Sequence, residues 1–292
     1  MELPDPRKIT TDKIHAPFLQ YKNVELDLLR LDKIHPVISG NKWFKLKYHL
    51  ENFNAGNYNG IMTFGGAWSN HIVATACTCY LQKIKCVGII RGEKPQQLSA
   101  TLLEADKYEM ELKFISREKY TQKDSKEFLE LIRKEFPGYY IIPEGGAGKE
   151  GEKGAAEILQ YTNRKNYTHI ACAVGTGTMF NGINRAASSN QNILGIVVLK
   201  GWKEQNKTHN AGLFLNYHFG GYAKYDQSLI DFMNEFFKLT NIPTGFVYTG
   251  KLTFALFDLI KKDHFPPASK ILIIHSGGLQ GNASLQKGSL IF

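Results

Sequence analysis

The sequence predicts an α/β fold in which a mostly parallel sheet is flanked by helices. Along its 292 residues, short apolar segments typical of buried strands alternate with longer segments of helical periodicity. This order is typical of β–α–β units, whose crossover connections make neighbouring strands parallel. Glycine-rich turns follow several of the strand segments, and parallel sheets bind their ligands at those ends.

The strand segments are short apolar runs bounded by turn-forming residues. The first begins at Glu25 and ends before the turn around His35 and Pro36, and the last runs into Gly277 and Gly278. In chain order, we expect strands at residues 25–31, 61–64, 86–90, 111–116, 139–143, 169–174, 193–199 and 270–275.

The helices are predicted from apolar residues at helical spacing and from capping residues. Trp43, Leu46 and Leu50 show this spacing in the first helix, and Ser69 with Asn70 caps the second. In chain order, we expect helices at residues 42–53, 70–81, 97–108, 124–135, 152–162, 179–187, 229–239 and 252–262.

The composition excludes several classes of protein. The 36 basic and 27 acidic residues give a net charge of +9, but the lysines are scattered and no nucleic-acid-binding motif accompanies them. No apolar run approaches the roughly 20 residues that span a bilayer, and the first residues lack the order of a signal peptide. The four cysteines show no CxxC spacing. We therefore expect a cytoplasmic protein with no nucleic-acid partner, no membrane association and no metal site.

Three loops contain residues that could hold one ligand. The first starts with Gly175, Thr176, Gly177 and Thr178, which expose backbone N–H groups and hydroxyls at a helix start. This favours phosphate binding over the alternative, a tight turn that simply requires glycine. The loop is neither a Walker A loop nor a GxGxxG loop, because the residues that those motifs require are missing.

The second loop, residues 65–71, places two glycines before Ser69 and Asn70. It builds an anion pocket the size of a carboxylate, although an ordinary helix cap explains one of the two polar residues equally well. The third loop, residues 39–42, places Lys42 at a helix start. A lysine forms a Schiff base only where burial or nearby cations make its amine lose its proton readily, and most lysines are simply solvated.

In this order, and together with residues 247–251 and 274–278, the three loops resemble the fold-type II pyridoxal-phosphate enzymes. Over nearly its whole length, the chain is similar to the family of D-cysteine desulfhydrase and 1-aminocyclopropane-1-carboxylate (ACC) deaminase. The resemblance implies a two-domain fold like that of tryptophan synthase β, with a small domain at 48–155 inserted into a large cofactor-binding domain at 1–47 and 156–292. It also implies a homodimer, with pyridoxal 5'-phosphate and a small amino-acid substrate in the cleft between the domains.

The resemblance implies roles for single residues as well. Lys42 would carry the cofactor as a Schiff base and later move a substrate proton, while Asn70 would bind the ring hydroxyl of the cofactor. Ser69, with neighbouring groups that include Asn70 and His71, would bind the substrate carboxylate. The cofactor phosphate would lie against Val174, Gly175, Thr176, Gly177 and Thr178.

Three further positions match residues of the family. Tyr248 and Tyr222 match tyrosines that face the substrate, and Thr249 falls where the family places a partner for the pyridine nitrogen. His71 is open to two interpretations: a proton shuttle, or a helix-start histidine bonded to the neighbouring backbone.

Two positions bear on the identity of the substrate. ACC deaminases carry a glutamate at the position of Thr249 and a glutamine at that of His71, so this chain follows the desulfhydrase-like pattern. A threonine hydroxyl cannot stabilise a protonated pyridine as a carboxylate does, so the ring should withdraw electrons more weakly. Elimination of a good leaving group tolerates this better than cyclopropane opening does. We therefore expect β-elimination of a D-amino acid such as D-cysteine to pyruvate, ammonia and sulfide. True ACC deamination to 2-oxobutyrate and ammonia is the alternative, because Ser276 matches neither branch and residues 200–213 are short for the family.

Two other classes of protein are alternatives to an enzyme of this family. A non-catalytic protein that stores or senses pyridoxal phosphate predicts cofactor binding without turnover, but retention of Lys42, Ser69 and Tyr248 favours an enzyme. A dinucleotide enzyme would need a GxGxxG loop and an acidic residue for the ribose, which the sequence lacks.

Overall fold

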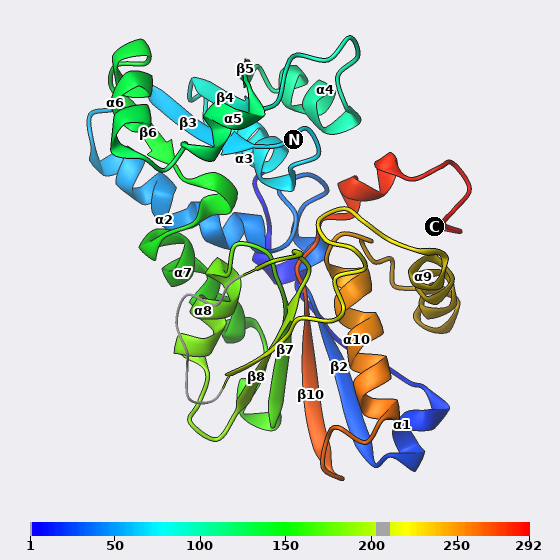
Figure 1. The fold of residues 1–292 in the computed structure, drawn as a ribbon. Helices are drawn as coiled ribbons and strands as arrows, with labels where there is room; N and C mark the ends of the chain where they lie inside the picture. The colour runs from blue at the N-terminus through cyan, green and yellow to red at the C-terminus, as the bar shows by residue number, and fades with distance from the viewer. Residues whose placement is uncertain (1, 203–210) are drawn as a thin grey trace.

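The computed structural model describes residues 2–202 and 211–292 of the chain (Figure 1). Within these residues the strands form two sheets, a six-stranded sheet in the order β1-β2-β10-β7-β8-β9 and a four-stranded sheet in the order β5-β4-β3-β6. The strand pairs are parallel except β1 with β2, which is antiparallel. The predicted α/β fold with mostly parallel sheets is therefore confirmed.

The large sheet is covered by helices on both faces. It contains β1 (Thr11–Lys13), β2 (Val24–Arg30), β7 (His169–Val174), β8 (Asn192–Val197), β9 (Ala211–Phe214) and β10 (Ser269–His275). On one face lie α1 (Pro17–Tyr21), α9 (Gln227–Thr240) and α10 (Thr249–Lys261), and on the other lie α2 (Asn41–Ala55), α7 (Lys149–Ala156) and α8 (Thr178–Ala186).

The strand sequences explain this double covering. In β10, Ile271 and Ile273 pack in one core cluster with α9 and α10, whereas Leu272 and Ile274 pack in another with α2, α7 and α8. Because successive side chains of a strand point to opposite faces, a sheet covered on both sides needs apolar residues at every position. This is why the strands appear in the sequence as continuous apolar runs.

The small sheet is built in the same way. It contains β3 (Gly60–Gly65), β4 (Cys86–Arg91), β5 (Glu111–Ile115) and β6 (Tyr139–Ile142). One face packs on α3 (Asn70–Leu81) and α4 (Ala100–Lys107), and the other packs on α5 (Arg117–Thr121) and α6 (Lys126–Glu135). All four strands lie inside the segment 48–155, whose limits as a domain stay a prediction.

Helices α2 and α7 connect the two sheets (Figure 1). The chain passes from β2 to β3 through α2 and from β6 to β7 through α7. The two helices cross very closely, because a Cβ atom at Gly154 in α7 would lie 1.8 Å from the carbonyl oxygen of Phe44 in α2. Only glycine fits at this crossing.

Several elements differ from the predicted ones. The helix expected at 152–162 is α7 followed by a 3-10 turn at Glu157–Tyr161, and the helix expected from residue 252 begins at Thr249. The short elements β1, α1, α5 and β9 were not predicted, because three to five residues are too few to show a period.

The segment 200–213, which is short for the family, is described only in part, because residues 203–210 lie outside the described residues. No helix of the described ranges is long and apolar enough to cross a membrane.

Candidate active site

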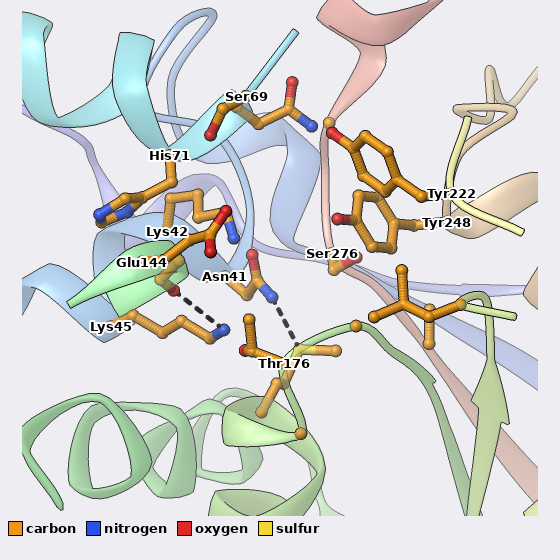
Figure 2. A pocket seen from close by; sticks show the side chains of 18 of the residues that line it. Asn41, Lys42, Lys45, Ser69, His71, Glu144, Thr176, Tyr222, Tyr248 and Ser276 are labelled. Carbon is orange, nitrogen blue, oxygen red and sulfur yellow. Dashed lines mark hydrogen bonds between the residues drawn. The ribbon is translucent and has the colours of Figure 1, made fainter. Parts of the chain in front are cut away.

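A cavity of about 290 Å³ lies between the two sheets, at the carboxyl ends of their strands (Figure 2). Residues that end or follow β2, β3, β4, β6, β7, β8 and β10 line it, so both sheets contribute walls. Parallel sheets bind ligands at this place, because the loops after the strands gather there. The three loops singled out from the sequence all reach this cavity.

Lys42 lines the cavity from the first turn of α2. The turn before it requires glycine: Gly40 has a φ of +67°, and a Cβ atom there would lie 1.8 Å from the carbonyl oxygen of Ser276. Burial lowers the pKa of Lys42 to about 8, and the negative charge of Glu144 partly opposes that shift. The amine therefore loses its proton far more readily than an ordinary lysine, as a Schiff base requires.

Ser69 and Asn70 enter the cavity at the start of α3. The hydroxyl of Ser69 caps the helix by accepting a hydrogen bond from the backbone N–H of Ile72, at 3.3 Å. The side-chain oxygen of Asn70 is buried and has no hydrogen-bond partner among the described residues. A buried amide oxygen without a partner is costly, so this position is prepared for a donor that a ligand brings.

His71 is 2 % exposed, and the hydrogen bond of its Nε2 atom defines its tautomer. The hydroxyl of Thr63 donates to the carbonyl oxygen of Ile142 at 2.9 Å, so it accepts from Nε2–H of His71, at 2.7 Å. Burial lowers the pKa of His71 well below its usual value, and the positive charges of Lys42 and Lys45 add to the effect. His71 is therefore neutral, and the partner that holds its ring is the side chain of Thr63 rather than the neighbouring backbone.

The glycine–threonine loop lies between β7 and α8. Gly175, Thr176 and Gly177 line the cavity, whereas Val174 and Thr178 are buried beside it. Gly177 has a φ of +86°, and the hydroxyls of Thr176 and Thr178 lie 3.0 Å apart. Backbone N–H groups and hydroxyls at a helix start suit a phosphate group.

Tyr248 and Tyr222 form an aromatic pair in the cavity wall. Their rings meet edge to face, with centroids 6.3 Å apart. Tyr222 belongs to a loop that Lys251 holds, because the ammonium group donates to the carbonyl oxygens of His218 and Gly221, each at 2.8 Å. Burial raises the pKa of both phenols, so both remain protonated and able to donate a hydrogen bond.

Thr249 does not line the cavity. It is 1 % exposed, and its hydroxyl accepts a hydrogen bond from the backbone N–H of Gly245, at 2.7 Å. The hydroxyl-bearing residue that reaches the cavity after β10 is Ser276, which Figure 2 shows beside Tyr248. The family resemblance assigns the Thr249 hydroxyl to the pyridine nitrogen, but a hydrogen bond at the start of α10 holds this hydroxyl instead.

Three charged residues of the cavity had no predicted role: Lys45, Arg91 and Glu144. Lys45 lies one turn after Lys42 and donates to the carbonyl oxygen of Gly145, at 3.2 Å. Burial lowers its pKa well below the usual value, and the charge of Lys42 lowers it further. The three-residue spacing of two lysines on one helix was the signal that could have found it. Arg91 ends β4 and Glu144 follows β6, at the edge where sheets gather functional groups.

The residues present fit pyridoxal phosphate. Lys42 has the lowered pKa that Schiff-base formation needs. The glycine–threonine loop suits the phosphate, and the unpartnered oxygen of Asn70 suits a ring hydroxyl. These three groups face one cavity, so a single ligand can contact all of them.

Comparisons with known proteins agree with this fit. The family model described as pyridoxal-phosphate dependent enzyme matches residues 9–277. A protein of Pyrococcus furiosus named "Putative 1-aminocyclopropane-1-carboxylate deaminase" is 29% identical over 275 residues, which cover 84% of this chain and 82% of that protein. The "Bifunctional D-cysteine desulfhydrase/1-aminocyclopropane-1-carboxylate deaminase, mitochondrial" of Arabidopsis thaliana is 26% identical over 88% of this chain and 73% of its own length.

The fold has a counterpart among solved structures. The structure described as "Crystal Structure Analysis of the ACC deaminase homologue" superposes with a TM-score of 0.80 at 22% identity, covering 94% of this chain and 90% of that one. The fold expected of a fold-type II enzyme is thereby confirmed. Since the family model covers most of the sequence, the chain belongs to the pyridoxal-phosphate-dependent enzyme family.

Proposed function

We propose that this protein catalyses β-elimination of a D-amino acid such as D-cysteine, giving pyruvate, ammonia and sulfide. The observation that carries the proposal is the convergence on one cavity of Lys42, the start of α3 with Ser69 and Asn70, and the hydroxyl-bearing Ser276. We infer that Ser276, in place of Thr249, is the partner of the pyridine nitrogen, because Ser276 lines the cavity and Thr249 does not.

The proposed role of each residue follows from its position in the cavity. When bound, the cofactor supplies an electron sink that stabilises negative charge on the carbon beside the substrate's amino nitrogen. Lys42 holds the cofactor and, once released, takes the proton from the α-carbon, since its lowered pKa suits a base near neutral pH. Ser69 and the N–H groups at the start of α3 bind the substrate carboxylate. Tyr222 and Tyr248 donate hydrogen bonds toward the substrate from their protonated phenols.

The partner of the pyridine nitrogen bears on the reaction class. A neutral hydroxyl does not stabilise the positive, protonated form of the ring, whereas a carboxylate does. The electron sink is therefore weaker with Ser276 than with an acidic partner. Elimination of a good leaving group such as hydrosulfide needs less of this stabilisation than opening a cyclopropane ring.

Deamination of ACC to 2-oxobutyrate and ammonia is the second candidate. The names of the Pyrococcus and Arabidopsis relatives both include that activity, and the second name also includes the desulfhydrase activity. A non-catalytic protein that holds pyridoxal phosphate is the third candidate. The residues Ser69, Tyr222 and Tyr248 argue against it, because they line the cavity where a substrate would lie and a storage site needs no substrate-binding groups.

The test is incubation of cofactor-loaded protein with D-cysteine, L-cysteine and ACC side by side, with identification of the 2-oxoacid released. Pyruvate and sulfide from the D-isomer alone are expected. Oxobutyrate from ACC would overturn the ranking of the two reactions. Visible absorbance of the bound cofactor without any turnover would favour the non-catalytic protein.

We further infer that two copies of the chain form the active unit, as the family resemblance implies. Light scattering of the cofactor-loaded protein is then expected to give twice the chain mass of 33.0 kDa. The mass of one chain would contradict this.

A further inference from the structure

Glu144 is the single carboxylate among the described residues that line the cavity. It opens the glycine-rich turn after β6, a turn to which the proposed function gives no part. The backbone holds it in place: Gly145 has a φ of +69°, and its carbonyl oxygen accepts a hydrogen bond from Lys45 at 3.2 Å. The carboxylate is thus attached to a fixed turn rather than to a free loop.

The charge of Glu144 acts on the reacting end of the cavity. It opposes the lowering of the pKa of Lys42, and it contributes to the raised pKa of Tyr248. Figure 2 shows its carboxylate on the same side of the cavity as the Lys42 amine. On the outer tyrosine, Tyr222, the charges of Arg91 and Glu144 act in opposite directions: Arg91 lowers the pKa of the phenol and Glu144 raises it.

The carboxylate is only partly neutralised by its neighbours. Its ion pair is with Lys123 at 3.5 Å, which is beyond a short hydrogen bond, and Lys123 lies closer to Asp124, at 2.8 Å. The phenol of Tyr120 is its other polar neighbour, and the carboxylate contributes to the raised pKa of that phenol. One such neutral donor leaves most of the acceptor positions of a carboxylate open. The side chain of Glu144 is 34% exposed, and it lines the cavity. Glu144 therefore retains acceptor capacity and negative charge for a ligand.

We propose that Glu144 is a specificity-determining residue that binds the substituent on the β-carbon of the substrate. It favours substituents that carry a proton to donate, such as a thiol, a hydroxyl or an ammonium group, and it disfavours anionic ones such as a phosphate ester. This inference rests on the proposed function and names the class of amino acid that the site takes.

The chemistry of elimination shows why the proton on the substituent matters. The Cα–H bond breaks and its proton goes to the Lys42 amine, while its electron pair forms the Cα–Cβ double bond. The bond from Cβ to the substituent breaks, and its electron pair leaves with the substituent. A thiol leaves as hydrosulfide only if it keeps its own proton, because a thiolate would have to leave as the dianion. A carboxylate beside a thiol raises the pKa of that thiol and so keeps the proton on it.

The test compares amino acids that differ only at the β-carbon, in the enantiomer that the wild-type enzyme turns over. The probes are 2,3-diaminopropionate with an ammonium group, β-chloroalanine with no proton to donate, and O-phosphoserine with an anionic group. For each probe, the Kd is measured from the absorbance change of the bound cofactor, and kcat/KM from the 2-oxoacid released. Glu144→Gln keeps the shape of the side chain and removes its charge. Glu150→Gln is the matched control, because Glu150 lies on the same segment but does not line the cavity.

The expected result is a change in preference. In Glu144→Gln, the kcat/KM for diaminopropionate divided by that for β-chloroalanine falls by about tenfold or more, since hydrogen bonds to charged groups are the strong ones. O-phosphoserine binds more tightly to this variant, so its Kd falls, because the negative charge that repels the phosphate is gone. Glu150→Gln leaves both preferences as in the wild type. An equal loss on every probe would overturn the inference, because Glu144 would then act on Lys42 alone.

Failure of this inference is distinct from failure of the proposed function. Wild-type enzyme that binds and turns over β-chloroalanine, with preferences that Glu144→Gln leaves unchanged, would overturn the role of Glu144 only. Wild-type enzyme that holds the cofactor and gives neither an absorbance change nor turnover with any probe would overturn both.

Discussion

At the residue scale, the readiness of Lys42 to lose its proton sets the pH at which the protein takes up its cofactor. The pKa of Lys42 is lowered from 10.5 to about 8. At pH 7, about one amine in ten is then neutral, instead of about one in 3,000 for an ordinary lysine. Only the neutral amine attacks an aldehyde, so the rate of uptake by apoenzyme is expected to rise about tenfold per pH unit up to pH 8 and to level off above it. Stopped-flow absorbance measures this rate.

Lys42→Ala is the control for that experiment. It removes the amine and leaves the other cavity residues in place, so the visible Schiff-base absorbance is lost while the circular dichroism spectrum is kept. A rate that still rose steeply near about pH 10 would contradict the lowered pKa. A yellow and active Lys42→Ala protein would refute the assignment of the lysine itself.

At the scale of elements, the crossing of α2 and α7 depends on Gly154. An alanine there would place its Cβ 1.8 Å from the carbonyl oxygen of Phe44, and backbone atoms cannot move aside as a flexible side chain can. We expect Gly154→Ala to lower the free energy of unfolding by about 1–3 kcal/mol, measured by chemical denaturation. Gly212→Ala is the control, because the nearest atom to a Cβ there lies 4.0 Å away. Equal stability of the two variants would show that the helix crossing has room for a Cβ atom at residue 154.

The loop that carries Tyr222 depends on one side chain of α10. Phe219 and Ala223 both have a φ of +52°, a conformation that costs energy outside glycine. The Lys251 ammonium holds this loop through the carbonyl oxygens of His218 and Gly221. We expect Lys251→Ala to raise the KM for the amino-acid substrate by about tenfold, since two carbonyl oxygens lose a charged donor. Ammonium chloride is expected to restore part of the loss, because an ammonium ion fits between the freed carbonyl oxygens. Sodium chloride at equal ionic strength is the comparison, and equal effects of the two salts would mean that Lys251 serves packing only.

At the scale of the whole molecule, the cavity joins two sheets that have separate cores. A ligand that touches both sheets binds the native arrangement and not the unfolded chain, so it stabilises the protein by mass action. At about 100 times its Kd, the cofactor is expected to add about 2.7 kcal/mol, which raises Tm by several degrees. Calorimetry of apoenzyme and loaded enzyme measures the shift. Identical Tm values would contradict a cofactor site built from both sheets.

How much of the site could be predicted depends on whether a residue's surroundings are local in the sequence. The loop at Gly175 was located because a glycine-rich turn after a strand has a recognisable composition, whereas the role of Lys42 came from the family resemblance. Glu144 had no predicted role, because it meets Lys42 only once the small sheet has packed against the large one. Lys45 is different, because it lies one turn after Lys42 on the same helix and its signal was present in the sequence. Thr249 shows the opposite effect: the family pattern assigns it to the cofactor, yet its own helix start binds its hydroxyl. The fold was easier to predict, since strands buried on both faces are apolar at every position.

The walls of the cavity come from two bodies that α2 and α7 join, and different parts of the bound ligands meet different bodies. The loop at residues 175–177, Tyr248 and Ser276 are carried by the large sheet, whereas Ser69 and Glu144 are carried by the small one. The proposed contacts of the cofactor phosphate thus lie on one body, and the proposed contacts of the substrate carboxylate and of the β-substituent lie on the other. Substitutions in the small sheet can therefore alter the contacts of the substrate carboxylate and β-substituent while leaving the phosphate loop as it is.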